Sequence, residues 1–398
     1  MQPLLLSHFT TTSCIGHGLA QTLASLRARR SGLKPCDFDT AALNTWTGSV
    51  EGVDDEVLRT DLRAFDCRNN RLAQLGLRQD NFEQAVDQAL ARVGRRRMGV
   101  FLGTSTAGIL QTELAYRRRD AVSGKLPADF IYATTHNPYS VSDFVRHLFN
   151  LDGPAMSVSS ACSSSSKVFA SARRMVEAGL IDAAIIGGVD TLCLTTLYGF
   201  NSLDLLSSRP CRPFDIARDG ISIGEAAAFI LLERVPGSLD ANAVLLRGIG
   251  ESSDAYHMSS PHPQGLGARL AMQQALATAG MEASEIDYIN LHGTATLSND
   301  AAEGAAVAAV FGDHATPCSS TKGATGHTLG AAGGLEAVIS ALALQNGLMP
   351  GGANTENLDA SIAVNYLMEN RQQSVTRVLS NSFGFGGTNC SLVFSRAG

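Results

Sequence analysis

One cysteine stands where a strand-like segment gives way to a helix-like one. The apolar run 155–159 predicts a buried strand, a serine-rich turn around Cys162 follows, and Val168, Ala172 and Val176 then recur at helical spacing. Free amide N–H groups and the positive end of a helix dipole would favour a thiolate there, and the same groups could hold an oxyanion. The alternative is a small buried residue at a tight junction, beside serines that only cap a helix.

Two histidines and a lysine occupy similar turns later in the chain. His292 follows a strand-like run and precedes Gly293, whereas Lys322 and His327 share one glycine-rich loop ahead of a helical pattern. A lone histidine is more often structural than catalytic. Three such groups in glycine-flanked turns at strand ends indicate chemistry, because α/β proteins place it there. Zinc is disfavoured, since the sequence has no HExxH motif and no closely spaced Cys/His set.

Strand-like and helix-like segments alternate along the chain, which predicts an α/β fold of layered sheets and helices. Residues 233–241 contain Pro236 and Gly237 and are the best candidate joint, which divides the chain into an N-terminal half, 1–236, and a C-terminal half, 237–398. No strict sequence repeat relates the halves. Strands are expected at 98–102, 155–159, 183–189, 226–232, 244–249, 286–291, 375–379 and 390–394.

Composition limits the class of protein. The chain has 398 residues, of which 44% are hydrophobic and 17% charged, so a large core is expected. A net charge of −6 disfavours nucleic acid as a partner. Eight scattered cysteines without a CxxC pair indicate a reduced, cytoplasmic protein. No membrane span is expected, because no uncharged apolar run reaches about 20 residues, and the N-terminus lacks the basic flank of a secretory signal.

Taken together, these motifs resemble β-ketoacyl-acyl carrier protein synthases of the elongating type, in the thiolase superfamily. The resemblance rests on the Cys162 turn, His292-Gly293-Thr294, Lys322 with Gly326-His327, and the run Asn-Ser-Phe-Gly-Phe-Gly-Gly-Thr-Asn at 381–389. Residues 253–258 also match, and residues before 95 match only loosely. The resemblance implies a thiolase-like, layered αβαβα fold of two related halves. It also implies the decarboxylating condensation of a cysteine-bound acyl chain with malonyl-acyl carrier protein, in fatty acid or specialised biosynthesis.

The resemblance further implies roles for individual residues. Cys162 would carry the acyl chain as a thioester, while the amide N–H groups of Cys162 and Phe385 hold the oxyanion. His292 and His327, as neutral donors, would bind the malonyl thioester oxygen. Lys322 is expected to pair with Glu336, and direct contact between Lys322 and substrate is the alternative.

Supporting and substrate-binding residues follow from the same resemblance. Glu303 is expected beneath the active site as a structural support. Phe200 has a second interpretation, an ordinary core aromatic residue. The expected contacts to the pantetheine arm and the acyl chain are Thr294, Thr296, Ser259, Phe200 and Phe383.

No cofactor is expected, because the phosphopantetheine arm arrives on the carrier protein. Asn290, Glu336 and residues 381–382 resemble positions where some relatives hold a structural alkali cation, and we expect no metal here. The expected partners are acyl and malonyl carrier protein, and either a second copy of the chain or a related subunit.

An acidic carrier would need a local basic patch, since the whole chain is negative. Arg68 and Arg71 are three residues apart and are expected to share one helix face that docks the carrier. Residues 117–119 with Lys125 form a second basic cluster. A solvated basic helix end is the alternative for both.

Two departures point to a specialised pathway. Residues 206–215 are shorter than in housekeeping enzymes, and Asp204 stands where those often carry a basic residue. Both resemble synthases of the aryl-polyene type, which can pair with a chain-length-factor-like partner. The rival functions are a non-catalytic, pocket-shaping partner, which would lack the nucleophile, and a degradative thiolase, which would need Cys390 as a second reactive cysteine.

Overall fold

The computed structural model describes residues 1–312 and 315–398, and its main sheet repeats one strand order twice. The N-terminal half runs β6-β5-β7-β9-β1 and the C-terminal half runs β12-β11-β16-β17-β10. In each half the first three strands are parallel and the last two are antiparallel to their neighbours. The expected pair of related halves is therefore confirmed. The strands are β1 (Leu4–Ser13), β5 (Met98–Gly103), β6 (Ala155–Val158), β7 (Ala183–Asp190), β9 (Ala226–Arg234), β10 (Val244–Ser253), β11 (Tyr288–Asn290), β12 (Pro317–Ser319), β16 (Arg377–Gly384) and β17 (Thr388–Arg396).

The two halves meet through their first strands. Leu4 to Leu6 of β1 pair antiparallel with residues 244–246 of β10, so the chain's N-terminus joins both halves into one sheet path. The loop between Arg234 and Val244 separates the two copies of the strand order, and the predicted division between residues 236 and 237 lies in it.

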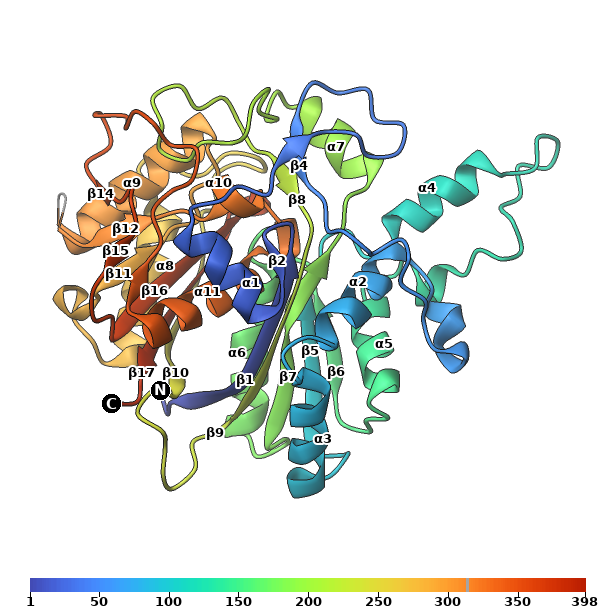
Figure 1. The fold of residues 1–398 in the computed structure, drawn as a ribbon, viewed down its shortest axis with the longest axis horizontal. Coiled ribbons are helices and arrows are strands. Elements are labelled where there is room, and N and C mark those ends of the chain that lie inside the picture. The colour runs from blue at the N-terminus through green and yellow to red at the C-terminus, as the bar shows by residue number, and fades with distance from the viewer. Residues whose placement is uncertain (313–314) are drawn as a thin grey trace.

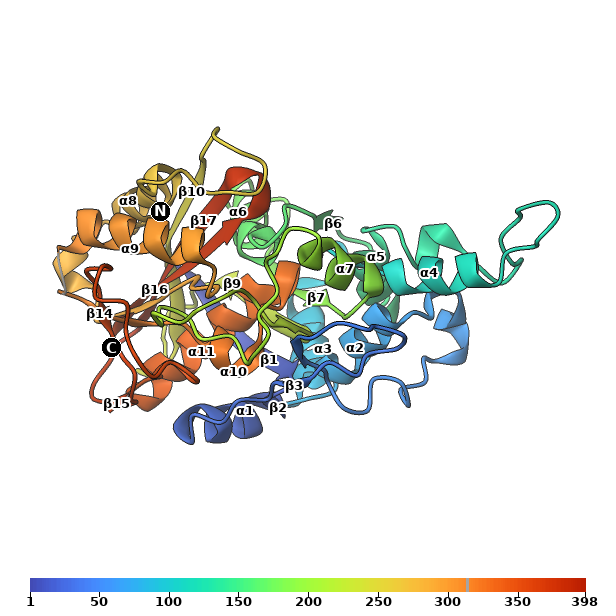
Figure 2. The same ribbon diagram turned by 90° about the horizontal axis from the view of Figure 1, so that it is seen from above.

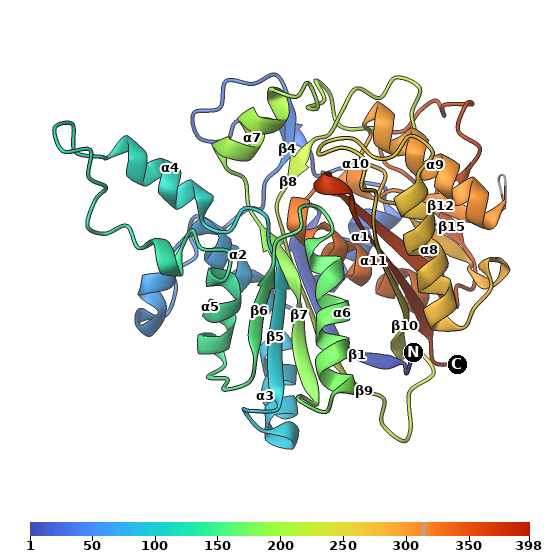
Figure 3. The same cartoon turned by 180° about the vertical axis from the view of Figure 1, so that it is seen from behind.

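The two halves of this sheet form two layers, with one layer of helices between them and one on each outer face (Figures 1 and 3). In the central layer, α6 (Ser164–Glu177) and α11 (Ala332–Asn346) contact each other, α6 packs on β5 and β7, and α11 on β9 and β16. The outer layers cover the other two faces, which gives the expected αβαβα stacking. They contain α2 (Arg68–Leu77), α3 (Phe82–Val93) and α5 (Ser140–Leu148) over the N-terminal half, and α8 (Leu266–Ala279) and α9 (Leu297–Phe311) over the C-terminal half.

The central helices are buried because their small residues allow close approach. All of α11 from Ala332 to Leu344 is buried, which explains the low charged fraction of the chain. A Cβ on Gly333 would lie 1.9 Å from the Ser166 hydroxyl of α6, so only glycine fits at this crossing. The two central helices therefore hold the ends of both sheets in a fixed relation.

Several shorter elements follow the carboxyl ends of the main strands, while others lie elsewhere along the chain. The segment from α4 (Ile109–Arg117) to residue 139 projects from the body of the molecule (Figures 1 and 2). No helix within residues 1–312 and 315–398 combines the length and hydropathy needed to cross a bilayer. The remaining elements are β2 (Gly16–His17), α1 (Gly18–Arg27), β3 (Lys34–Pro35), β4 (Trp46–Gly48), η1 (Thr60–Phe65), η2 (Tyr132–Thr134), α7 (Leu194–Asn201), β8 (Ile223–Gly224), η3 (Ala283–Glu285), α10 (Lys322–Thr325), η4 (Leu329–Ala331), β13 (Leu348–Met349), β14 (Asn365–Tyr366), β15 (Arg371–Gln372) and η5 (Phe385–Gly387).

Two details differ from the sequence-based expectation. The first strand, β1, was missed, because its mixture of Thr, Ser and Leu carries no clean alternation. The predicted buried strand at 155–159 is instead a half-buried edge strand, and Met156 of β6 is 42% exposed. An edge strand has a neighbour on one side only, so its backbone groups on the other side are left without a partner strand.

Candidate active site

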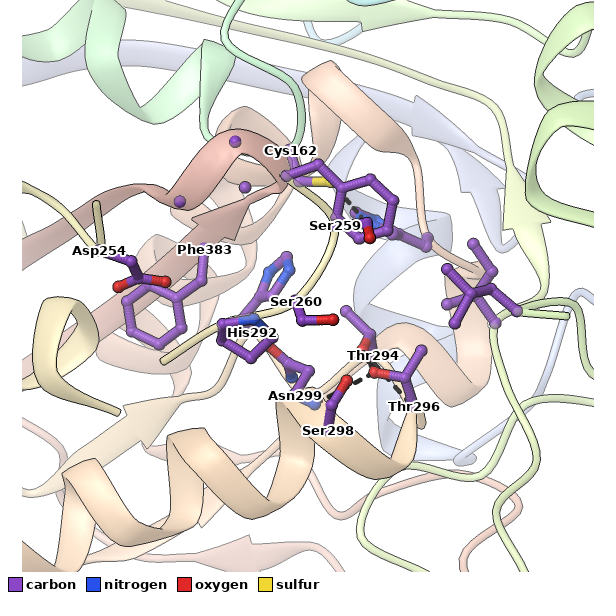
Figure 4. A pocket seen from close by; sticks show the side chains of 18 of the residues that line it. Cys162, Asp254, Ser259, Ser260, His292, Thr294, Thr296, Ser298, Asn299 and Phe383 are labelled. Atoms are coloured by element: carbon purple, nitrogen blue, oxygen red, sulfur yellow. Dashed lines mark hydrogen bonds between the residues drawn. The ribbon is translucent and has the colours of Figure 1, made fainter. Parts of the chain in front are cut away.

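The site residues lie in turns at the carboxyl ends of four strands. Cys162 follows β6, His292 follows β11, Lys322 and His327 follow β12, and Phe385 follows β16. The N-terminal half thus supplies the cysteine and the C-terminal half supplies the remaining groups. Figure 4 shows Cys162 and His292 facing one cavity.

Cys162 lies on a strained turn and is 5% exposed. Ala161 immediately before it has φ of 51°, an uncommon conformation for a residue with a side chain. Burial raises the pKa of the Cys162 thiol to about 11, although the Lys322 charge and the Phe385 amide N–H both lower it. The expected preference for a thiolate at this turn is therefore wrong: the effect of burial exceeds that of both lowering groups, and a pKa of about 11 keeps the sulfur as a thiol.

His327 provides the base that this thiol needs. Its Nε2 lies 2.9 Å from Cys162 Sγ, within hydrogen-bond reach. Burial, and next the Lys322 charge, hold the pKa of His327 well below its usual value, so the ring is neutral and can accept the thiol proton. Its Nδ1 has no hydrogen-bond partner among the described residues, so neither tautomer is fixed.

His292 is held differently, in a single tautomer. Lys322 Nζ lies 3.3 Å from His292 Nδ1 and 2.5 Å from the His292 carbonyl oxygen. An ammonium can only donate, so Nδ1 accepts and the ring proton sits on Nε2. Burial, the Lys322 charge and His327 keep the pKa of His292 well below its usual value. His292 therefore presents a neutral Nε2–H donor, and its ring centroid lies 5.3 Å from that of His327.

Two buried glutamates support these rings. Glu336 forms an ion pair with Lys322, and burial raises the pKa of Glu336 to about 7. Glu303 accepts the backbone N–H groups of His292 at 2.8 Å and Gly293 at 2.7 Å, and it also accepts from Asn381. Burial raises the pKa of Glu303 to about 7 as well. Both residues therefore hold the turns that carry the histidines, and neither lines the cavity.

Comparison with protein families identifies the family to which this site belongs. Residues 9–236 match the β-ketoacyl synthase N-terminal domain and residues 243–356 match the β-ketoacyl synthase C-terminal domain. The chain belongs to the β-ketoacyl synthase family. It is an acyl-transferring condensing enzyme, as the resemblance implied.

Individual relatives cover nearly the whole synthase. The 3-oxoacyl-[acyl-carrier-protein] synthase 2 of Coxiella burnetii is 34% identical, with 96% of each chain covered. The 3-oxoacyl-[acyl-carrier-protein] synthase 1 of Haemophilus influenzae is 32% identical, with 100% of this chain and 99% of the relative covered. Among solved structures, the complex of ketosynthase ApeO with its chain length factor ApeC from Xenorhabdus doucetiae contains a chain that is 37% identical. It superposes with a TM-score of 0.89 and covers 100% of this chain and 98% of the other.

The cavity of the synthase holds the expected substrate-contacting residues together. Thr294, Thr296, Ser259, Phe200 and Phe383 all line it, with the Phe200 and Phe385 rings 5.5 Å apart beside Cys162. Lys322 does not line it and is 1% exposed, so the structure offers no direct contact between Lys322 and substrate. Lining residues that the sequence did not assign to the cavity are Leu205, Ile221, Asp254, Ser260, Pro261, Ser298, Asn299, Gly384, Gly386, Gly387 and Asn389.

These missed residues had only a weak signal. Asp254 and Asn389 fell within the matching segments 253–258 and 381–389. Their side chains bond to each other at 2.9 Å, and the Asp254 backbone N–H donates to the Gly387 carbonyl. Nothing in the sequence showed that the two segments touch.

The rival functions lose support from the same geometry. A non-catalytic partner would lack a nucleophile, whereas Cys162 and both histidines are present and face one another. Cys390, which a degradative thiolase would use, is fully buried in β17 and lines no part of the cavity.

The docking expectation for Arg68 is wrong. Its side chain is 7% exposed and forms two hydrogen bonds to the buried carboxylate of Glu225, with Asp54 as a third contact. A fully paired, buried guanidinium ties α2 to the loops above it and is unavailable to a carrier. Arg71 remains partly exposed but is paired with Asp66.

The donor atoms of Cys162, His292 and His327 lie within 4.8 Å of one another, a spacing that suits a metal. The Lys322 ammonium, however, holds the proton on His292 Nε2, so no lone pair points inward there. Elsewhere, Asn290 Oδ1 and Glu336 Oε2 are buried without hydrogen-bond partners among the described residues, which suits an alkali cation. Asn381 Oδ1 already accepts from the Ser391 hydroxyl and Ser382 Oγ accepts from Ser166, so this set fits a cation only in part.

The raised pKa of Cys162 predicts an unusual pH profile. A thiol with a pKa near 11 is almost entirely protonated at pH 7, and its thiolate fraction rises about tenfold per pH unit. Iodoacetamide should therefore alkylate Cys162 at a rate that climbs continuously from pH 6 to pH 9, followed by peptide mass spectrometry. A plateau below pH 8 would contradict the thiol assignment.

Proposed function

We propose that the synthase condenses a Cys162-bound acyl chain with malonyl-acyl carrier protein, releasing carbon dioxide and forming 3-oxoacyl-acyl carrier protein. The observation that carries the proposal is the pairing of a buried thiol with one unfixed histidine, beside a second histidine whose proton is fixed on Nε2. The first pair suits acyl transfer. The second histidine suits stabilisation of an enolate.

Acylation uses the Cys162–His327 pair. His327 Nε2 takes the thiol proton as the sulfur attacks the thioester carbonyl carbon, and the S–C bond forms as the carbonyl becomes an oxyanion. The Cys162 and Phe385 N–H groups stabilise that oxyanion. Its collapse breaks the bond to the pantetheine sulfur, which leaves as a thiol with the proton returned by His327. The low pKa of His327 favours that return.

Condensation uses both histidines as donors. Loss of carbon dioxide from the malonyl group breaks a C–C bond and leaves its electron pair as an enolate, with charge on the thioester oxygen. His292 Nε2–H donates to that oxygen, and this donor is present before and after acylation because Lys322 fixes the tautomer. His327 joins it once Cys162 is acylated, since the sulfur then has no proton to give. The enolate carbon attacks the carbonyl carbon of the Cys162 thioester, and the sulfur leaves as a thiolate as the new C–C bond forms. The thiolate then takes up one proton from solvent, which restores the resting thiol.

No resident cofactor takes part in this proposal, because the carrier protein delivers the phosphopantetheine arm. Thr294 and Thr296 line the cavity, and their hydroxyl oxygens lie 3.0 Å apart. Both hydroxyl groups can bond to the amides of such an arm. A cytoplasmic location is part of the same proposal, and the eight free thiols of the described structure support it.

Intact-mass spectrometry tests the proposal. Incubation with an acyl carrier thioester should add one acyl group to the wild type, and subsequent malonyl carrier should release it as 3-oxoacyl carrier. Cys162→Ala should gain no acyl mass, because it lacks the attacking sulfur. An adduct that persists in Cys162→Ala, or turnover of coenzyme A esters without malonyl carrier, would contradict the proposal.

We propose that the carrier docks in a groove beside the projecting segment that runs from α4 to residue 139, instead of at Arg68. The groove is lined by Arg63 and Arg71 on one side and by Arg118 on the other, so it joins the two basic clusters seen in the sequence. Arg71 and Arg118 are paired with Asp66 and Asp129. Arg63 is exposed and, unlike the other two arginines of the groove, forms no ion pair among the described residues, so it is the groove cation most available to an acidic carrier.

Charge reversal tests this groove. Arg63→Glu should raise the KM for the carrier substrate several-fold, with a weaker salt dependence and a nearly unchanged kcat, because it acts on encounter rather than chemistry. Arg96→Glu is the matched control, since Arg96 is exposed at the opposite ends of the strands. Equal KM values for the two variants would remove Arg63 from the docking surface.

A related subunit is the proposed partner. The ketosynthase ApeO is in complex with its chain length factor, and a chain of the ishigamide ketosynthase/chain length factor is 26% identical, with a TM-score of 0.90 over 100% of both chains. The unpaired edge of β6, with Met156 exposed, offers a strand for pairing.

Native mass spectrometry of the chain expressed alone checks this assignment. The expected result is a chain that forms no stable homodimer, takes up the acyl group on its own and condenses faster when it is coexpressed with a related subunit. A stable homodimer that condenses on its own would show that the partner is a second copy.

A further inference from the structure

The two oxyanion-hole donors come from opposite halves of the chain. One is the N–H of Cys162 after β6, and the other is the N–H of Phe385 at the tip of the β16–β17 hairpin. No disulfide joins the two turns, because all eight cysteines are free, and 222 residues of chain separate Cys162 from Phe385. Donors must lie about 2.7–3.1 Å from the oxyanion to be effective, so some contact has to fix one tip against the other.

Ser163, the residue after Cys162, does not cap its helix with its side chain. Ser163 is the N-cap residue of α6, a position where serine usually accepts a backbone N–H of the first turn. Here its side chain makes no cap hydrogen bond. Ser163 Oγ instead lies 3.0 Å from the Ser160 carbonyl oxygen and 2.9 Å from Thr388 Oγ1. The helix therefore forgoes a cap while the hydroxyl reaches across to the other half.

Thr388 completes this contact from the hairpin. It pairs with Gly384 across the strand ladder and so closes the loop that carries Phe385. Its Oγ1 lies 3.0 Å from the Ser160 carbonyl and 2.9 Å from Ser163 Oγ, which is itself a donor to the same carbonyl. The two hydroxyls hold one proton each, so Thr388 donates either to the carbonyl or to Ser163, and both arrangements tie it to the nucleophile turn. Gly384 also packs close here, since a Cβ on it would lie 3.0 Å from the same Ser160 oxygen. One threonine hydroxyl thus binds both ends of the nucleophile turn.

We propose that Thr388 is a positioning residue that, through Ser163 and the Ser160 carbonyl, locks the Phe385 N–H against the Cys162 N–H. Thr388 does not line the cavity, so it acts through these two groups and not on substrate. The role rests on the proposed function, because it matters only for a reaction that passes through an oxyanion.

Removing the hydroxyl should loosen the hairpin tip and leave Cys162 in place. Thr388→Val keeps the side-chain shape and loses both hydrogen bonds. Loss of a donor from an oxyanion hole slows acyl transfer by about 10²–10³-fold. A donor that is displaced but still present should cost less, on the order of tenfold or somewhat more.

Two reactions of the same sulfur separate positioning from general damage. Acylation by an acyl carrier thioester passes through an oxyanion, whereas alkylation by iodoacetamide is a direct displacement at carbon and does not. Thr388→Val should slow the first by tenfold or more and leave the second within about twofold of the wild type. Thr388→Ser, which keeps the hydroxyl, should restore acylation.

Thr278→Val is the matched control, since Thr278 also bridges backbone carbonyls through a half-buried hydroxyl, far from the site on α8. It should change neither rate. Should Thr388→Val fail to fold, Ser163→Ala removes the other member of the contact and should show the same selective loss.

The outcomes distinguish the two proposals. Acylation of Thr388→Val at the wild-type rate, or an equal fall in both reactions, would overturn the positioning role while leaving the proposed function intact. A wild type that takes no acyl group from the carrier, yet is alkylated normally, would overturn the proposed function and this role with it.

Discussion

The charge of Lys322 is the constraint on which the site depends. An ammonium that is 1% exposed must be fully satisfied, because a buried unpaired charge costs several kcal/mol. Its three partners are the Glu336 carboxylate, the His292 carbonyl and His292 Nδ1. The first balances the charge, the second fixes the turn, and the third sets the tautomer. A side chain that never reaches substrate thus decides which imidazole atom meets it.

The turn that carries Lys322 is itself held from outside. Helix α10 spans four residues, Lys322–Thr325, too few to be stable alone. Its carbonyl groups are bound by other segments: Cys211 Sγ approaches the Lys322 oxygen at 3.2 Å, and Asn354 Nδ2 donates to the Gly323 oxygen at 2.6 Å. Gly32 donates its N–H to Ala324. Residues far along the chain thereby restrict the ammonium to one position.

The sequence predicted the pieces of this site better than their contacts. Types and spacing marked Cys162 and the histidines as candidates at strand ends, because glycine-flanked turns are local signals, and the family resemblance then gave them their roles. Pairing across the fold left no such trace. Arg68 looked like a surface cation because its carboxylate partner, Glu225, is 157 residues away. The serine run beside Cys162, which includes Ser163, suggested only a helix cap for the same reason, since Thr388 lies 225 residues further on.

The repeated strand order explains why these long-range contacts converge. Strands β6 and β12 occupy the same place in the two halves, and each is followed by a turn and then by a central helix, α6 or α11. The Cys162 turn and the Lys322 turn are therefore equivalent positions of two similar units, brought together where the central helices meet. The duplicated strand order supplies two facing turns. One carries the nucleophile Cys162, and the other carries Lys322, whose charge fixes the tautomer of His292. The hydroxyl of Thr388, bonded to Ser163, then fastens the turn after β16 to the Cys162 turn. With the His292 turn after β11, four strand ends enclose one reacting sulfur.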